Sequence, residues 1–264
     1  MRCAVENLSE AEITELIARN VTEFVIHNSY DMIKRLSLHL SVAMCLKTCN
    51  LSTCLDMECI LESEENNFSL LKTMNLFILQ KLRMICGEVV KPRTLMNLRS
   101  IHVEACSSLK CLFQKQLMLE RKSLEEITIV HCLGMEEIIE GERNTNAEDS
   151  GHAAKLMLPK LQSLKLLYLR NLKRIYNGHI QCDSLRTFEV CDCIALTKLP
   201  LGLFGVETGQ QMSPSSALEQ IRCDEQWWES LQWDQPQAKH LLQPCFVNPH
   251  SSRDRFAPSN SNTA

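Results

Sequence analysis

Four cysteines near the start of the chain are the residues best suited to binding a metal ion. Cys45, Cys49, Cys54 and Cys59 follow one another with the spacing C-x3-C-x4-C-x4-C. Structural zinc sites commonly use more closely spaced pairs of cysteines around a tetrahedral ion. Cys49 and Cys54 also fall at positions that a repeated apolar pattern, described below, assigns to the interior. We therefore expect no metal and no cofactor in this segment.

Two histidines could serve as a general acid and a general base. His102 and His131 each lie on or next to a segment that we expect to be a strand, but no nucleophile accompanies them. The chain also lacks a G-x-x-x-x-G-K-[ST] phosphate loop, a G-x-S-x-G nucleophile turn, an H-E-x-x-H motif and paired C-x-x-C motifs. We expect no enzymatic activity. A hydrolase hidden in the irregular segments is an alternative that would need a pocket holding a nucleophile and a base.

The bulk composition narrows the partners and the compartment. The formal net charge is −4 and the sequence pI is about 6.1, so no basic field points to nucleic acid. The N-terminus has no apolar signal segment, and no run of apolar residues is long enough to span a membrane. Fourteen cysteines in a chain of 264 residues without a signal then suit free thiols in the cytoplasm.

The elements that would position these side chains follow from the stretch Leu161 to Ile175, which reads LQSLKLLYLRNLKRI. Its apolar residues fall at offsets 0, 3, 5, 8, 11 and 14 from Leu161. The step of two between offsets 3 and 5 is strand spacing, because alternate side chains of an extended chain share a face. The steps of three suit turns and short helical pieces. The stretch is therefore predicted to be one coil of a solenoid.

The same six offsets recur along the chain. Full matches begin at Leu46, Leu71, Leu98, Leu124, Leu161 and Leu185, mostly 24 to 27 residues apart, and a broken match begins at Leu218. At 45% apolar content a single window matches by chance in roughly 1% of cases, so six matches that each open with Leu are not accidental. This period and the L-x-x-L-x-L-x-x-C/N core are typical of leucine-rich repeats. The predicted fold is an α/β solenoid, a leucine-rich repeat horseshoe with a parallel sheet on its concave face.

The repeats divide the chain into three parts. Residues 46–233 are predicted to form about seven repeat units, with an acidic loop inserted at residues 140–155. Residues 1–45 are predicted to be a degenerate repeat or a truncated approach to the array, and residues 234–264 a disordered tail rich in Pro, Gln, Ser and Asn. The tryptophans of the segment 224–233 are expected to cover the open end of the last coil, with a binding platform as the alternative.

Side chains at offsets 2, 4, 6 and 7 are predicted to line the concave face. Several of them are apolar or aromatic at positions that burial does not demand, and mixed with charges they suit protein recognition; partial shielding by neighbouring side chains is the alternative. The candidate binding residues are Phe77, Ile78, His102, Glu104, Thr128, Val130, His131, Lys165, Leu167, Tyr168, Glu189 and Asp192.

Three segments resemble one family. The run Leu158-Pro159-Lys160-Leu161 leading into LQSLKLLYLRNLKRI, the stretch SLEEITIVHCLGMEEII and the closing EQWWESLQWD are similar to the C-terminal leucine-rich repeats of plant coiled-coil nucleotide-binding disease resistance proteins. The resemblance covers about residues 46–233. The continuation C-x-x-L/M-x-x-I and the Trp-Trp pair are its more specific features.

The resemblance implies a sensing role without catalysis. Repeats of this family recognise pathogen effectors or host proteins altered by them, and help to hold the receptor inactive. The nucleotide-binding switch has no counterpart in this sequence, so we expect a fragment or a truncated product whose partners are a protein ligand and a nucleotide-binding domain in cis or in trans. A substrate-receptor adaptor of a ubiquitin ligase is the alternative, although residues 1–45 contain no segment resembling an F-box.

Overall fold

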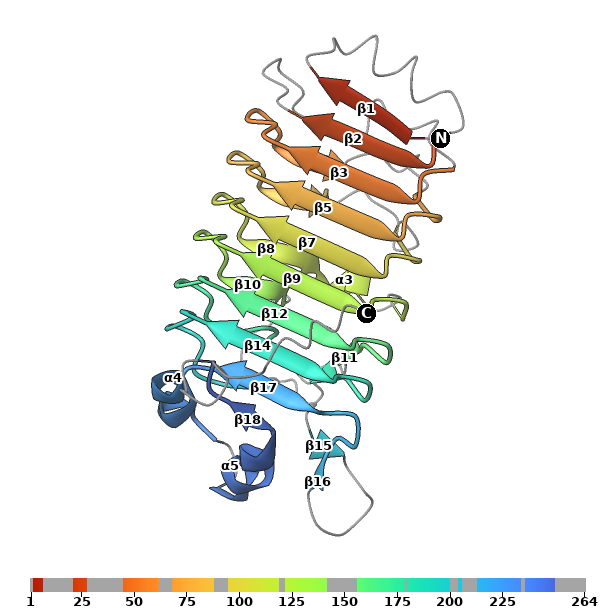
Figure 1. Cartoon of the computed structure of the whole chain (residues 1–264). Helices are drawn as coiled ribbons and strands as arrows, with labels where there is room; N and C mark the ends of the chain where they lie inside the picture. Colours follow the sequence, from red (N-terminus) through yellow and green to blue (C-terminus); the bar gives the residue numbers. More distant parts are fainter. Residues whose placement is uncertain are drawn as a thin grey trace, which may run out of the picture.

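The computed structural model of this protein is a stack of coils built on one long parallel sheet (Figure 1). It describes residues 2–6, 21–27, 45–61, 68–87, 95–118, 122–141, 156–178, 180–199, 204–205, 213–233 and 236–249. The main sheet has ten strands in the order β1-β2-β3-β5-β7-β9-β12-β14-β17-β18. Their bounds are β1 Arg2–Glu6, β2 Glu23–His27, β3 Thr48–Ser52, β5 Thr73–Phe77, β7 Ser100–Glu104, β9 Glu126–Val130, β12 Ser163–Leu167, β14 Thr187–Cys191, β17 Gln220–Cys223 and β18 Phe246–Val247.

Short elements lie on the side of the coils away from this sheet. Strands β4 (Cys59–Leu61) and β6 (Met84–Cys86) form one parallel pair, β8 (Cys111–Gln114) and β10 (Glu137–Glu140) a second, and β11 (Leu156–Met157) and β13 (Ile180–Gln181) a third. Strands β15 (Phe204–Gly205) and β16 (Ser213–Pro214) pair antiparallel. Helices in the described part are short: α3 (Lys115–Met118), α4 (Glu225–Ser230) and α5 (Pro236–Leu242). The predicted fold class is confirmed, with less helix than the term α/β suggests.

The repeat spacing explains how each coil folds. In β5 and β12 the residues at offsets 3 and 5 are buried and those at offsets 2, 4 and 6 are half-buried, which is the alternation of a strand with one face against the core. The step from offset 8 to offset 11 is a turn closed by one backbone hydrogen bond, from Leu172 N to Leu169 O at 3.0 Å and from Leu82 N to Leu79 O at 3.1 Å. The mixed period therefore reflects a strand followed by a turn.

The core is continuous from coil to coil. Ile127 of β9 lies in register with Ile101 of β7 and Leu164 of β12, and all three are at most 3% exposed. Backbone groups also pair between coils, as where Gln162 N and Ser163 N both donate to the carbonyl of Glu125. Each coil is therefore completed by its neighbours, as expected of a repeat array.

The sheet extends beyond the first predicted unit. Val21, Phe24 and Ile26 are buried and take the places of offsets 0, 3 and 5, a half-repeat that the sequence analysis missed. Strand β2 pairs in register with β3, and β1 pairs with β2. Between the two alternatives for residues 1–45, these strands favour a degenerate repeat.

The C-terminal end of the stack is covered by a cap. Trp227 and Trp228 of α4 are buried, and Nε1 of Trp227 donates to the carbonyl of Leu196 at 2.9 Å. The ring of Trp228 lies 5.0 Å from that of Phe246 and 5.1 Å from that of Trp233. The tryptophans thus cover the last coil, as the first of the two alternatives predicts.

The prediction of a disordered tail from residue 234 is wrong for residues 236–249. This segment forms α5, a 3-10 turn at Gln243–Cys245 and β18, which adds a strand beside β17. Leu242 is fully buried and Ala238 nearly so, because the open end of the solenoid offers them an apolar surface. Residues 250–264 and residues 142–155 of the predicted acidic loop lie outside the described part; Glu140 ends β10.

Buried thiols occupy the inner turn of several coils. Sγ of Cys193, at offset 8, donates to the carbonyl of Leu166 in the preceding coil at 3.3 Å and to that of Cys191 at 3.4 Å. Cys132 repeats this arrangement toward Val103 and Val130. Thiols at offset 8 thus fill the inner turn and donate to carbonyls of their own and the preceding coil. Burial raises the pKa to about 12 for four thiols, those of Cys49, Cys182, Cys193 and Cys223.

The offset-3 positions should not tolerate a polar side chain. Replacing Ile127 by Asn places an amide among hydrocarbon and removes aliphatic volume, so the free energy of unfolding should fall by at least about 3 kcal/mol. The matched change Thr128→Asn, on the half-buried face of the same strand, should cost less than about 1 kcal/mol. Urea unfolding followed by circular dichroism measures both, and equal losses would contradict the burial pattern.

The buried thiols should destabilise the protein at alkaline pH. Burial raises the pKa of such a thiol from 9 to about 12, so the thiol loses its proton at a lower pH in the unfolded chain than in the folded one. The contribution of the thiol to the free energy of unfolding is therefore complete below pH 9 and is lost between pH 9 and 12. The loss should be about 1.4 kcal/mol for each such thiol at pH 10. Urea midpoints at pH 8 and pH 10 measure it. Cys193→Ser keeps a donor that does not titrate in this range, so its alkaline loss should be smaller by that amount; identical losses would show that Cys193 stays protonated in both states.

Candidate functional site

Eight of the twelve predicted binding residues stand at offset 4 or 6 of their strands and are therefore on the face of the main sheet opposite the core. The other four are at offset 7, just after the strands. The twelve residues extend from β5 to β14, which is four strand spacings or about 19 Å. The strands that carry them are β5 for Phe77, β7 for His102 and Glu104, β9 for Thr128 and Val130, β12 for Lys165 and Leu167, and β14 for Glu189; Ile78, His131, Tyr168 and Asp192 are at offset 7.

The offset-7 residue has an unusual backbone in every coil from Thr53 to Asp192. Its φ lies between 51° and 59° in six successive coils, and none of the six is glycine. This left-handed conformation costs an L-residue about 1–2 kcal/mol. It lets the amide of Ile78 donate to the carbonyl of Glu104 at 2.9 Å and that of His131 to Leu167 at 3.0 Å. The turn continues the ladder between coils and brings the offset-7 side chain to the rim of the face.

Both histidines of the face pack against aromatic rings. His131 stacks on Tyr168 with ring centroids 4.3 Å apart and 7° between the planes. His102 meets Phe77 edge-on at 5.0 Å. The thiol of Cys191, through its charge and a hydrogen bond, raises the pKa of the Tyr168 hydroxyl. These contacts give both histidines a packing role.

The C-terminal part of the face carries charge in pairs. Nζ of Lys165 lies 3.5 Å from Oε2 of Glu189 in the next strand, and Nε of Arg170 donates to Oδ2 of Asp192 at 2.8 Å. Arg170 was absent from the predicted set because it sits at offset 9, beyond the strand. The sequence could have predicted this contact, because Arg170 is basic and the residue at offset 7 of the next coil, Asp192, is acidic.

The N-terminal part of the face is joined by side-chain amides. Nδ2 of Asn75 donates to Oδ1 of Asn50 at 2.6 Å across β3 and β5. Asn50 in turn lies 3.5 Å from Oε1 of Glu23 on β2. Both asparagines are at offset 4. Asparagine at the same offset of two neighbouring coils therefore predicts a hydrogen bond between their side chains. The face therefore changes along the stack from amide, through apolar and aromatic, to charged.

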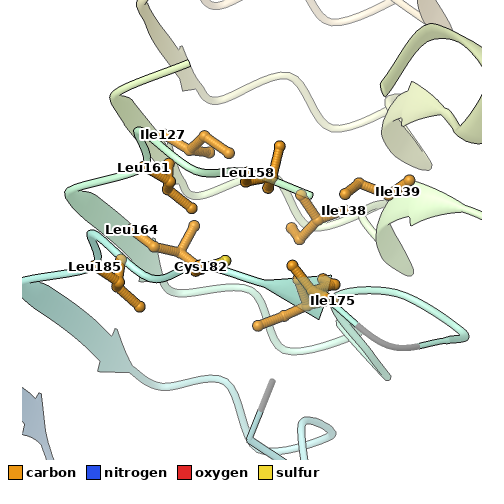
Figure 2. Close-up of a pocket in the computed structure, with 10 residues that line it drawn as sticks. Ile127, Ile138, Ile139, Leu158, Leu161, Leu164, Ile175, Cys182 and Leu185 are labelled. Carbon is orange, nitrogen blue, oxygen red and sulfur yellow. The ribbon is translucent and has the colours of Figure 1, made fainter. Parts of the chain in front are cut away.

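A small apolar cavity lies inside the described coils. A cavity of about 10 Å³, roughly the space of one water molecule, lies between the coils of β9, β12 and β14 (Figure 2). Its lining consists of hydrocarbon and one thiol: Ile127, Ile138, Ile139, Leu158, Leu161, Leu164, Ile175, Ile180, Cys182 and Leu185. It contains neither a base nor a charged group.

The described ranges contain neither a metal-binding cluster of side chains nor a membrane-spanning helix. There, no three His, Cys, Asp or Glu side chains come together in a way that could hold an ion. Of the four early cysteines, Cys49, Cys54 and Cys59 are buried and Cys45 is half-buried. None of the helices within those ranges has the length and apolar character that crossing a bilayer requires.

Comparison with known proteins agrees with this geometry. Residues 118–201 match the model of a family described as plant disease resistance protein RPS2-like, leucine-rich repeats. Disease resistance protein At4g27190 of Arabidopsis thaliana is 31% identical over 157 residues, which are 58% of this chain and 14% of that protein. Probable disease resistance protein At4g27220 of the same plant is 35% identical over 107 residues, 40% of this chain and 11% of the relative.

A third relative, disease resistance protein SUMM2 of Arabidopsis thaliana, is 27% identical over 158 residues, 59% of this chain and 16% of its own length. The chain thus spans less than a fifth of the length of these relatives. No solved structure matches it. The resemblance predicted from the sequence is confirmed: these coils are leucine-rich repeats similar to those of plant disease resistance proteins.

Proposed function

We propose that this chain is a protein-recognition module of a plant immune receptor, which senses a pathogen effector or an altered host protein through the concave face and contributes to autoinhibition. The observation that carries the proposal is the row of apolar and aromatic side chains at the rim of that face. Ile78 is 42% exposed and Tyr168 39% exposed. Exposed aromatic and aliphatic side chains beside charges are the composition of protein-binding hot spots.

The left-handed backbone at offset 7 supports this interpretation. Glycine would adopt φ near +55° without strain, yet Ile78, His131 and Tyr168 carry large side chains there. Backbone strain that persists at a surface is a reason to look for function. We infer that these side chains, held in place by the hydrogen bonds between coils, contribute contacts with a ligand.

The proposed compartment is the cytoplasm. The thirteen cysteines whose side chains the structure describes are free thiols, and nine of them are buried. Buried free thiols persist where glutathione keeps them reduced. The relatives named above are called disease resistance proteins. From the family resemblance we also propose a nucleotide-binding domain as a partner of this chain.

Capture of partners from leaf cells tests the proposal. The full chain, tagged and expressed in leaves exposed to a pathogen, should retain an effector, a modified host protein or a nucleotide-binding receptor segment, identified by quantitative mass spectrometry. Replacing Leu167 and Tyr168 by Ala removes central contacts and should reduce capture at least tenfold, since a hot-spot residue contributes about 2 kcal/mol or more.

The control is Lys81→Ala, away from the main sheet, where the exposed ion pair with Asp56 contributes little. It should capture the same proteins as the unmodified chain. Capture that is insensitive to the Leu167/Tyr168 change, or recovery of ubiquitin-ligase subunits in place of immune proteins, would contradict the proposed function.

A further inference from the structure

Glu104 has an apolar neighbour on each adjacent strand in the middle of the concave face. It ends β7 at offset 6, and its register partners on the two adjacent strands are Phe77 of β5 and Val130 of β9. Neighbouring strands are about 4.8 Å apart, so both side chains flank the carboxylate. The side chain of Glu104 is 43% exposed. Its charge is therefore accessible from solvent and bordered by hydrocarbon on either side.

The contacts of Glu104 differ from those of other carboxylates on this face. Glu189 has Lys165 and Asp192 has Arg170, while Glu126 accepts a hydrogen bond from Ser100 at 3.4 Å. Within the described ranges, the ion-pair contact of the Glu104 carboxylate is with His102, whose Nε2 lies 3.6 Å away. That nitrogen is buried and makes no hydrogen bond. Among the lysines and arginines that the structure describes, none forms an ion pair with Glu104.

The residues at the rim around Glu104 also include acidic side chains but no lysine or arginine. Ala105 follows Glu104 at offset 7 and is small, whereas Ile78 and His131 on the adjacent coils are large. Across β3 to β14 the residues at offsets 6 and 7 include two carboxylates and no lysine or arginine. They are Ser52, Thr53, Phe77, Ile78, Glu104, Ala105, Val130, His131, Leu167, Tyr168, Cys191 and Asp192.

From this arrangement we propose that Glu104 receives an arginine or lysine side chain of the protein ligand, whose alkyl stem packs on Phe77 and Val130. A carboxylate framed by hydrocarbon matches a long cationic side chain in both parts, the stem and the charged head. The occupant is thus a segment of a protein with a basic residue between apolar ones. The inference rests on the proposed function, because it specifies the ligand of the same face.

Selection from a displayed library of random twelve-residue peptides tests it with the full chain as bait. The unmodified chain should enrich peptides in which Arg or Lys is flanked by Leu, Ile, Val or Phe. The strongest binder is then synthesised with its Arg kept or replaced by citrulline, the neutral isostere. The citrulline peptide should bind at least tenfold more weakly in fluorescence anisotropy, and the difference should shrink as salt is raised.

The matched pair of variants is Glu104→Gln and Glu126→Gln, two glutamates on the same face that differ in their neighbours. Glu104→Gln should remove the preference for Arg over citrulline, and Glu126→Gln should keep it. The proposal is overturned if no peptide is enriched, if the enriched peptides are acidic or lack a cation, or if Glu104→Gln retains the preference. Glu104→Gln that captures leaf partners as well as the unmodified chain would sink this inference alone and leave the proposed immune role intact.

Discussion

The structure depends on one constraint: no coil can bury its own apolar side chains. Leu166 lies in register with Ile129 on one side and Val190 on the other, and none of the three is more than 1% exposed. The backbone obeys the same constraint, since the amides that open each strand pair with the coil before. In a stack of this kind only the end coils lack a neighbour on one side, so each end needs another covering. At the C-terminal end Trp227, Trp228 and Leu242 supply the apolar surface that a further coil would have supplied.

The same constraint separates stability from recognition. Alternate residues of a strand point to opposite sides, so in β12 Leu164 and Leu166 belong to the core while Lys165 and Leu167 belong to the face. Side chains on the face can change without opening a cavity. Its ion pairs link adjacent coils and are partly exposed, so each contributes little to folding, and a ligand that displaces one loses little. A surface of this type can vary while the coil beneath stays the same.

Much of this arrangement could be predicted from the sequence because the signal is repeated. Pairs such as Ile101 and Val103, two residues apart and after a leucine, placed the strands and thereby assigned the face of Glu104 and Lys165. The half-repeat at Val21 was missed because it opens with Val and its second half does not follow the spacing. Residues 236–249 were missed because Pro and Gln there suggest disorder in isolation; their order comes from the exposed end of the stack, which composition does not describe.

Side-chain geometry was less predictable than position. The spacing placed His131 and Tyr168 on neighbouring coils but not their parallel stacking, which depends on the left-handed turn at offset 7. The sequence does not predict this turn, because the six residues at offset 7 differ in type, from a small alanine (Ala105) to a large tyrosine (Tyr168). They share no preference for a left-handed backbone. The conformation is imposed from outside, by the amide that must reach the carbonyl of the next coil. Because the stack fixes the backbone at this point, it also fixes where the rim side chains begin, and the recognition that we propose at the rim depends on the packing of the core.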